Sequence, residues 1–290
     1  ASLRRATGLN TTLTLMRSQP FFLDTPDGRL FAVHHRPDGQ AVGQVLSVLP
    51  FNEEMNRSRS MVTQMAQGFA ALGLGTLVLD LLGTGDSEGD FGDARWALWQ
   101  RNLQAGLDWL QGQEGGCRWI WGIRLGALMA AELQARQQRA DLGLLLWQPV
   151  LDGKTHLTQF LRVRMAAALD RADQPKETTA GMRAQLAAGE PVEVAGYLLH
   201  PELCAALDAA KLESHRPAAG SRVLWLEQGN GEPPALALPS QTLLSRWPGD
   251  GVRCDARLFS GPAFWQLHER TLAADAIAQT VAWLKERGNV

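Results

Sequence analysis

An arginine occupies the position at which a catalytic nucleophile would be expected. Residues 117–136, CRWIWGIRLGALMAAELQAR, predict a buried strand, a five-residue turn and an apolar helix. The turn reads Gly122-Ile123-Arg124-Leu125-Gly126. Its spacing matches a Gly-x-Ser-x-Gly elbow, in which a sharp strand-to-helix turn exposes a nucleophilic serine. Because a guanidinium stays protonated and has no attacking oxygen, the turn predicts the elbow geometry without its usual chemistry.

Arg124 is expected to need a negative partner. It precedes a predicted helix, and a cation at a helix N-terminus is disfavoured by about 0.3–1 kcal/mol. Glu53 and Glu54 follow a predicted strand at 44–51 and are the nearest candidate partners. Two hypotheses stay open: a structural ion pair between Arg124 and one of these carboxylates, or a site in which Arg124 anchors a bound anion.

The elements around this turn predict an α/β fold with a doubly wound, mostly parallel sheet. Besides the strand and helix within 117–136, the sequence predicts strands at 19–24, 29–36, 44–51, 76–81, 142–150, 222–228 and 252–260, and helices at 58–73, 94–113 and 275–287. The first two strands are expected to form an N-terminal β-hairpin across the turn at 25–28. Strands that are apolar on both faces and alternate with amphipathic helices are typical of a sheet covered on both sides.

A segment between the sixth and seventh sheet-forming regions interrupts this alternation. It contains three helical patterns, at 154–171, 176–189 and 201–212, and shows no clear strand. We therefore expect a core formed by residues 1–152 and 221–290, with a helical cap at 153–220.

Composition narrows the function classes. The chain has 290 residues, 45% of them hydrophobic, and a net charge of −2, which argues against a nucleic-acid-binding face. The three cysteines are far apart and odd in number, which predicts no disulfide framework and favours the cytoplasm. We expect no membrane span, because no run of 18 apolar residues occurs. The histidines lack metal-ligand spacing, so neither a metal nor another cofactor is expected.

Over roughly residues 19–287 the chain resembles the α/β-hydrolase superfamily. The strings PFNEEMNRSR, GIRLGA, LLLWQPVLDG and GPAFWQ are similar to hydrolase 2 of the exosortase A system. That family accompanies exopolysaccharide biosynthesis and PEP-CTERM protein sorting in Gram-negative bacteria. The resemblance implies an α/β-hydrolase fold with a cap over the site. It also implies a saccharide or acyl ligand and a possible protein partner in exopolysaccharide assembly.

The catalytic residues of the superfamily do not all transfer to this chain. The resemblance places an oxyanion-hole loop at 50–56 and an acid near Glu227. The histidine position reads Phe264-Trp265, and His268 follows three or four residues too late, which makes it a weak catalytic candidate. A literal Gly-x-Ser-x-Gly at 85–89 resembles a structural loop of the superfamily, so Ser87 is expected to cap a turn.

Aromatic residues at the carboxyl edge of the sheet suggest a ligand pocket. Trp147 ends one predicted strand and Trp265 follows the last one, and ligands of open α/β sheets bind at this edge. Core packing is the alternative for both. The residues expected to bind a ligand are Asn52, Leu125, Trp147, Phe264 and Trp265.

Three functional interpretations follow. The first is a binding or accessory protein with an anionic small-molecule ligand, saccharide or acyl in nature. The second is an esterase-like or thioesterase-like hydrolase, in which Glu53 or Glu54 activates water and Arg124 stabilises the oxyanion. The third is a scaffold that serves only protein interactions. The missing serine favours the first over the second.

Overall fold

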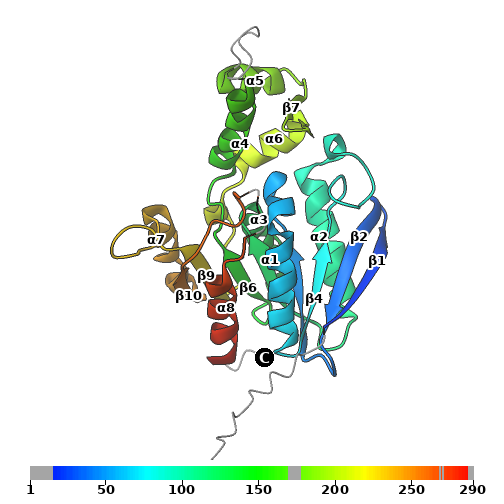
Figure 1. The fold of residues 1–290 in the computed structure, drawn as a ribbon, viewed down its shortest axis with the longest axis vertical. Helices are drawn as coiled ribbons and strands as arrows, with labels where there is room; N and C mark the ends of the chain where they lie inside the picture. The colour runs from blue at the N-terminus through cyan, green and yellow to red at the C-terminus, as the bar shows by residue number, and fades with distance from the viewer. Residues whose placement is uncertain (1–15, 169–177, 268, 270, 287–290) are drawn as a thin grey trace, which may run out of the picture.

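The computed structural model describes residues 16–168, 178–267, 269 and 271–286. Its main sheet, in the described chain, has the strand order β1-β2-β4-β3-β5-β6-β9-β10 (Figure 1). The strands are β1 (Arg17–Thr25), β2 (Gly28–Arg36), β3 (Gly43–Val48), β4 (Leu74–Leu79), β5 (Cys117–Ile123), β6 (Gly143–Trp147), β9 (Arg222–Gln228) and β10 (Arg253–Phe259). β1 and β2 form an antiparallel hairpin, and β2 pairs antiparallel with β4. The other neighbouring strands of this sheet, in the order β4-β3-β5-β6-β9-β10, pair in parallel. The expected N-terminal hairpin and mostly parallel sheet are confirmed.

Helices cover both faces of this sheet. Helices α1 (Glu53–Ala70) and α8 (Ala274–Glu286) pack on one face, and α2 (Trp96–Gln111) and α3 (Leu125–Gln137) pack on the other. Side chains alternate along each strand, so Trp119 and Trp121 of β5 enter the core beneath α1 and α8. Ile120, between them, enters the opposite core. Because helices cover both faces of the sheet, the side chains that point to either face are apolar, and each central strand reads as a continuous apolar run.

Helix α1 begins earlier than the predicted start at residue 58. Glu53 and Glu54 occupy its first turn, where the free N–H groups and the helix dipole favour negative charge. Both carboxylates are therefore held by a helix instead of a loop, which fixes their direction relative to β5. No helix in the described part of the chain is both long and apolar enough to cross a membrane.

Residues 153–220 are called here the inserted segment. They contain α4 (Gly153–Ala168), α5 (Thr179–Ala187), β7 (Val192–Val194), β8 (Tyr197–Leu199), α6 (Pro201–Ala209) and the 3₁₀ helix η2 (Leu212–Ser214). The helices α4, α5 and α6 lie above the carboxyl end of the sheet (Figure 1). The expectation of helices alone is wrong, because β7 and β8 form a small hairpin. Its two turn residues, Ala195 and Gly196, have φ angles of 51° and 85°. An Asn-Gly or Asp-Gly pair would have signalled this turn, and Ala-Gly does not.

Most of the inserted segment is closed off by two backbone hydrogen bonds. The Gly153 N–H donates to the Ala210 carbonyl at 2.9 Å, and the Leu212 N–H donates to the Leu151 carbonyl at 2.9 Å. Residues 151–153 and 210–212 therefore lie side by side, at the base of α4 and just after α6.

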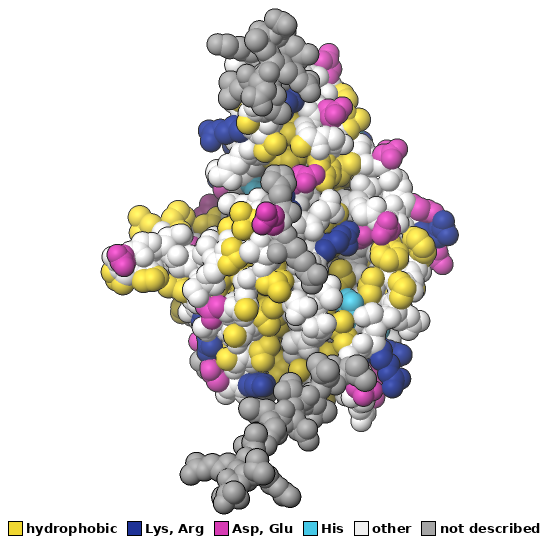
Figure 2. All heavy atoms as spheres, viewed as in Figure 1, with side chains coloured by type: hydrophobic (Ala, Val, Ile, Leu, Met, Phe, Trp, Pro, Cys, Tyr) yellow, Lys and Arg dark blue, Asp and Glu magenta, His cyan; other side chains and the backbone are white. Residues whose placement is uncertain are grey.

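The remaining elements are α7 (Leu238–Leu244), η1 (Phe91–Asp93) and η3 (Trp247–Asp250). On the face shown in Figure 2, positive and negative side chains are interspersed and no broad basic area is visible.

Candidate functional site

Arg124 has the backbone of a nucleophile elbow. It lies between β5 and α3 with φ 56° and ψ −120°, a conformation that is strained for any residue except glycine. A Cβ atom at Gly122 would collide with the Ala127 backbone, and one at Gly126 would collide with the Val48 carbonyl. Both glycines are therefore needed for the close approach of α3 to β5 and β3, and the local geometry expected from the spacing is present.

The Arg124 side chain forms an ion pair with Glu54. Arg124 Nε lies 3.2 Å from Glu54 Oε1 and 3.3 Å from Oε2, and Nη2 lies 3.1 Å from Oε1. The two side chains are only 14% and 18% exposed. The guanidinium carbon also lies 5.3 Å from the centroid of the Trp265 ring, within cation–π range. The expected contact between Arg124 and one of the two glutamates is confirmed, and the partner is Glu54.

The ion pair lines a cavity of about 250 Å³, which we call the elbow pocket. Helix α4 contributes His156, Gln159 and Phe160 to its wall, and the segment after β10 contributes Trp265 and Gln266. Glu53, Glu54, Arg57 and Arg124 also line it, so the formal charges of its wall cancel. The pocket has both polar and apolar walls, carries no net formal charge and is partly covered by the inserted segment.

Burial dominates the titration of two groups in the elbow pocket. It raises the pKa of Glu54 from its usual value, and the Arg124 charge and hydrogen bonds oppose this shift. Burial, together with the Arg124 charge, lowers the pKa of His156 to about 3. At neutral pH this histidine is therefore uncharged.

The other predicted polar residues play different parts. Glu53 is 39% exposed, and its Oε2 lies 3.8 Å from Arg57 Nη2. Burial and the nearby Glu53 carboxylate together raise the pKa of Tyr197 to about 12. Asn52 and Leu125 are buried, and they line a second cavity described below. His268 lies outside the described residues.

Two of the predicted binding residues belong to the core. Trp147 is 1% exposed, its Nε1 donates to Thr280 Oγ1 at 3.0 Å, and its ring centroid lies 4.9 Å from that of Trp121. Phe264, also 1% exposed, packs edge to face against Trp147. The expectation that they form a pocket wall is wrong, because α8 and the aromatic cluster of the sheet cover both rings.

The acid and serine suggested by the superfamily pattern are structural. Glu227 accepts hydrogen bonds from Trp225 Nε1 at 3.0 Å and from the Ala237 N–H at 2.8 Å. Ser87 Oγ donates to the Asp80 carbonyl at 2.6 Å and accepts from the Phe31 N–H at 2.8 Å. Ser87 thus ties its loop to the sheet, as expected for a capped turn.

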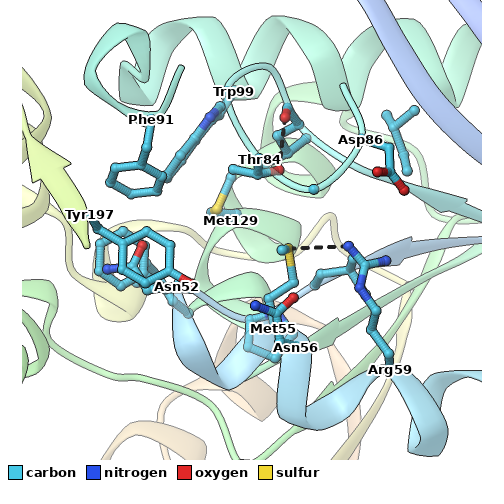
Figure 3. A pocket seen from close by; sticks show the side chains of 18 residues that line it. Asn52, Met55, Asn56, Arg59, Thr84, Asp86, Phe91, Trp99, Met129 and Tyr197 are labelled. Carbon is cyan, nitrogen blue, oxygen red and sulfur yellow. Dashed lines mark hydrogen bonds between the residues drawn. The ribbon is translucent and has the colours of Figure 1, made fainter. Parts of the chain in front are cut away.

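Sequence reasoning missed a second cavity, of about 470 Å³, beside the elbow pocket (Figure 3). We call it the methionine pocket, after Met55 and Met129 in its wall. Among the described residues, Phe51 is the one that lines both cavities. The roles of Phe51 and His156 were also missed. The position of Phe51, three residues after β3, could have suggested its place at the carboxyl edge of the sheet, whereas His156 lies in α4, far from β3 in the sequence. The described residues contain no cluster of side chains suited to a metal ion.

No protein-family model matches the sequence, and no curated protein matches it. Solved structures with similar folds do exist. Est1E from Butyrivibrio proteoclasticus, solved with ferulic acid, is 14% identical, with a TM-score of 0.61 over 92% of this chain and 96% of that chain. A lipase/esterase from Lactobacillus plantarum is 14% identical, with a TM-score of 0.59 over 95% and 100% of the two chains.

The α/β hydrolase GrgF from Penicillium sp. sh18 is also 14% identical, with a TM-score of 0.60 over 93% and 98% of the two chains. At this level of identity the likeness concerns the fold alone. Together with the strand order and the elbow geometry, these comparisons show that the chain has the α/β-hydrolase fold.

Proposed function

We propose that this protein is a ligand-binding or accessory protein on an α/β-hydrolase fold, and that it is not a serine hydrolase. The observation that carries the proposal is the Arg124–Glu54 pair at the elbow. The position that would present a nucleophile instead presents a paired cation. The serine of the literal Gly-x-Ser-x-Gly string, Ser87, is committed to two hydrogen bonds in its loop.

The elbow pocket supports a polar ligand. Gln159, Gln266 and uncharged His156 offer hydrogen-bonding groups that suit the hydroxyls of a saccharide, and Phe160 offers an apolar surface for an acyl substituent. The four sequence strings that are similar to hydrolase 2 of the exosortase A system suggest that this ligand comes from exopolysaccharide assembly in the cytoplasm. An anionic ligand would have to compete with Glu54 for Arg124, so the charge of the ligand is the feature to test.

Fluorophosphonate probes are expected to leave this protein unlabelled, because no serine stands at the elbow. Intact-mass spectrometry after incubation with a fluorophosphonate, beside an active serine esterase as positive control, measures this directly. A stoichiometric adduct on Ser87 or on any other serine would show that the non-serine interpretation is wrong.

Binding of acidic oligosaccharides is expected to weaken as salt rises, if Arg124 contributes to holding an anion. Calorimetry at two salt concentrations, with the wild type and Arg124→Ala, tests this. A neutral acylated oligosaccharide serves as the control ligand, because its affinity should change little with the salt concentration. Salt-independent binding of the neutral ligand alone would leave Arg124 with a structural role, and absence of binding by either ligand would contradict the proposal.

A second candidate function is an esterase or thioesterase reaction without a serine. One observation favours it: burial raises the pKa of Glu54, which brings this carboxylate closer to the range of a general base. In such a reaction Glu54 would take a proton from water, and Arg124 would stabilise the oxyanion that forms. Turnover of a short-chain ester or thioester that disappears in Glu54→Gln would move the protein into this class.

A further inference from the structure

The methionine pocket is separate from the elbow pocket and carries an inference of its own. None of Arg124, Glu54 and His156 lines it, and among the described residues the two cavities share only Phe51. Its volume, about 470 Å³, lies within the range of small-molecule sites. What it binds can therefore be argued without the proposed function of the elbow.

Most of the wall is apolar and aromatic. The Phe91 ring lies 5.9 Å from Phe51, 6.0 Å from Trp99 and 5.0 Å from Tyr197, measured between ring centroids. Met129 lines the same cavity (Figure 3). Thioethers adapt their shape and pack well against aromatic groups. This wall suits an aryl or acyl body.

One polar side chain in this wall has no partner. Asn52 is 5% exposed, and neither its Oδ1 nor its Nδ2 has a hydrogen-bond partner among the described residues. Figure 3 shows Asn52 next to Tyr197 at one end of the cavity. A buried amide without partners is costly, and a bound group that offers both a donor and an acceptor would remove this cost. A carboxamide offers both.

Among the described residues, the wall offers no free partner to a charged ligand. Arg59 lines the cavity, but its Nη2 already lies 3.1 Å and 3.0 Å from the two carboxylate oxygens of Asp80, which does not line it. Asp86 also lines the cavity and is exposed, so water screens its charge. A ligand carboxylate or ammonium would therefore lose its hydration among mostly apolar groups without gaining an unpaired buried partner. An uncharged polar group avoids this cost.

We propose that the methionine pocket binds an uncharged ligand that joins an aromatic or acyl body to a carboxamide. The apolar body packs against Met129 and the rings, and the carboxamide pairs with Asn52. The proposal concerns recognition alone and includes no chemical step.

The test uses three probes with the same phenylpropyl body: 3-phenylpropanamide, 3-phenylpropanoate and (3-phenylpropyl)trimethylammonium. Calorimetry with the full chain is expected to show the amide binding most tightly, with each charged probe weaker by about tenfold or more. Asn52→Gly is expected to weaken amide binding by about tenfold, the loss of two hydrogen bonds. Glycine accepts the φ of 51° at this position, so the variant should fold with an unchanged or higher melting temperature.

Two further variants locate the site. Met129→Phe should reduce binding by filling the cavity, whereas Val163→Phe, at a 45% exposed residue of the elbow pocket, should leave binding unchanged. The proposal is overturned if the amide does not bind, if a charged probe binds as tightly, or if Asn52→Gly retains full affinity. Loss of binding in Val163→Phe would place the probe in the elbow pocket and also overturn it. None of these results bears on fluorophosphonate labelling or oligosaccharide binding, which test the elbow separately.

Discussion

Replacing Arg124 with methionine is expected to lower the free energy of unfolding by about 3 kcal/mol, because Glu54 is left as a buried carboxylate without its partner. The two side chains are 14% and 18% exposed, which places the effect at the lower end of the range for buried pairs. Methionine faces the same backbone strain as arginine at φ 56°, so this strain cancels in the comparison. Urea unfolding followed by circular dichroism measures the change.

Two controls make the result specific. The double variant Arg124→Met/Glu54→Met removes both charges and should recover much of the loss, since apolar groups often replace a buried pair without net cost. Arg101→Met breaks a pair with Asp27 in which the arginine is 59% exposed, and should cost only about 0–1 kcal/mol. If Arg124→Met leaves stability unchanged or raises it, the pair is not structural and a ligand role for Arg124 gains support.

Acidification is expected to destabilise the protein through His156. Its pKa is about 3 in the folded protein, below the usual value of 6.5, because burial and Arg124 disfavour the charged ring. The unfolded chain therefore binds this proton first, and the stability contributed by the neutral ring is present above pH 6.5 and is lost as the pH falls toward 3. Between pH 6.5 and 4.5 the loss from this residue should reach about 2.5 kcal/mol.

A comparison with His156→Phe isolates this residue. Burial also lowers the pKa of His35, to about 4, and that of His34, so the wild type carries other histidine contributions of the same sign. Phenylalanine keeps an aromatic ring near Phe51, whose centroid lies 5.8 Å from that of His156. Urea unfolding at pH 7.0, 5.5 and 4.5 should show a shallower decline for the variant. Equal declines would mean that the His156 ring is hydrated and not buried in its neutral form.

The elbow could be predicted from sequence because its determinants are local. Gly122 and Gly126 are needed wherever a helix returns this closely to its strand, and their spacing is visible in the chain. The ion pair could be predicted as well, because a cation at a helix N-terminus demands compensation and few acids lie near enough. Which glutamate would serve depended on the start of α1, which the apolar periodicity alone did not reveal.

The cavities could not be predicted for a different physical reason. Trp147 is the last residue of β6 and Trp265 follows β10, yet Trp147 is enclosed by Trp121 and α8 while Trp265 flanks Arg124. Whether a side chain at the carboxyl edge of the sheet is buried or lines a cavity depends on the segments that pack over it. For the methionine pocket these segments include Tyr197 of the inserted segment, which is far away in the sequence. The periodicity of apolar residues in the sequence identifies which positions are buried, but it does not identify the cavities that lie between them.

The backbone pairing at the base of α4 has a consequence for how this protein could diversify. Hydrogen bonds between Gly153 and Ala210, and between Leu151 and Leu212, close residues 153–210 at a single neck. Because the entropy of closing a loop grows only slowly with its length, residues beyond such a neck can be lengthened, shortened or exchanged at little thermodynamic cost to the sheet. The neck thus makes the covering part of the molecule a replaceable module. A lineage could change what is recognised by exchanging this module while it keeps the same sheet and elbow.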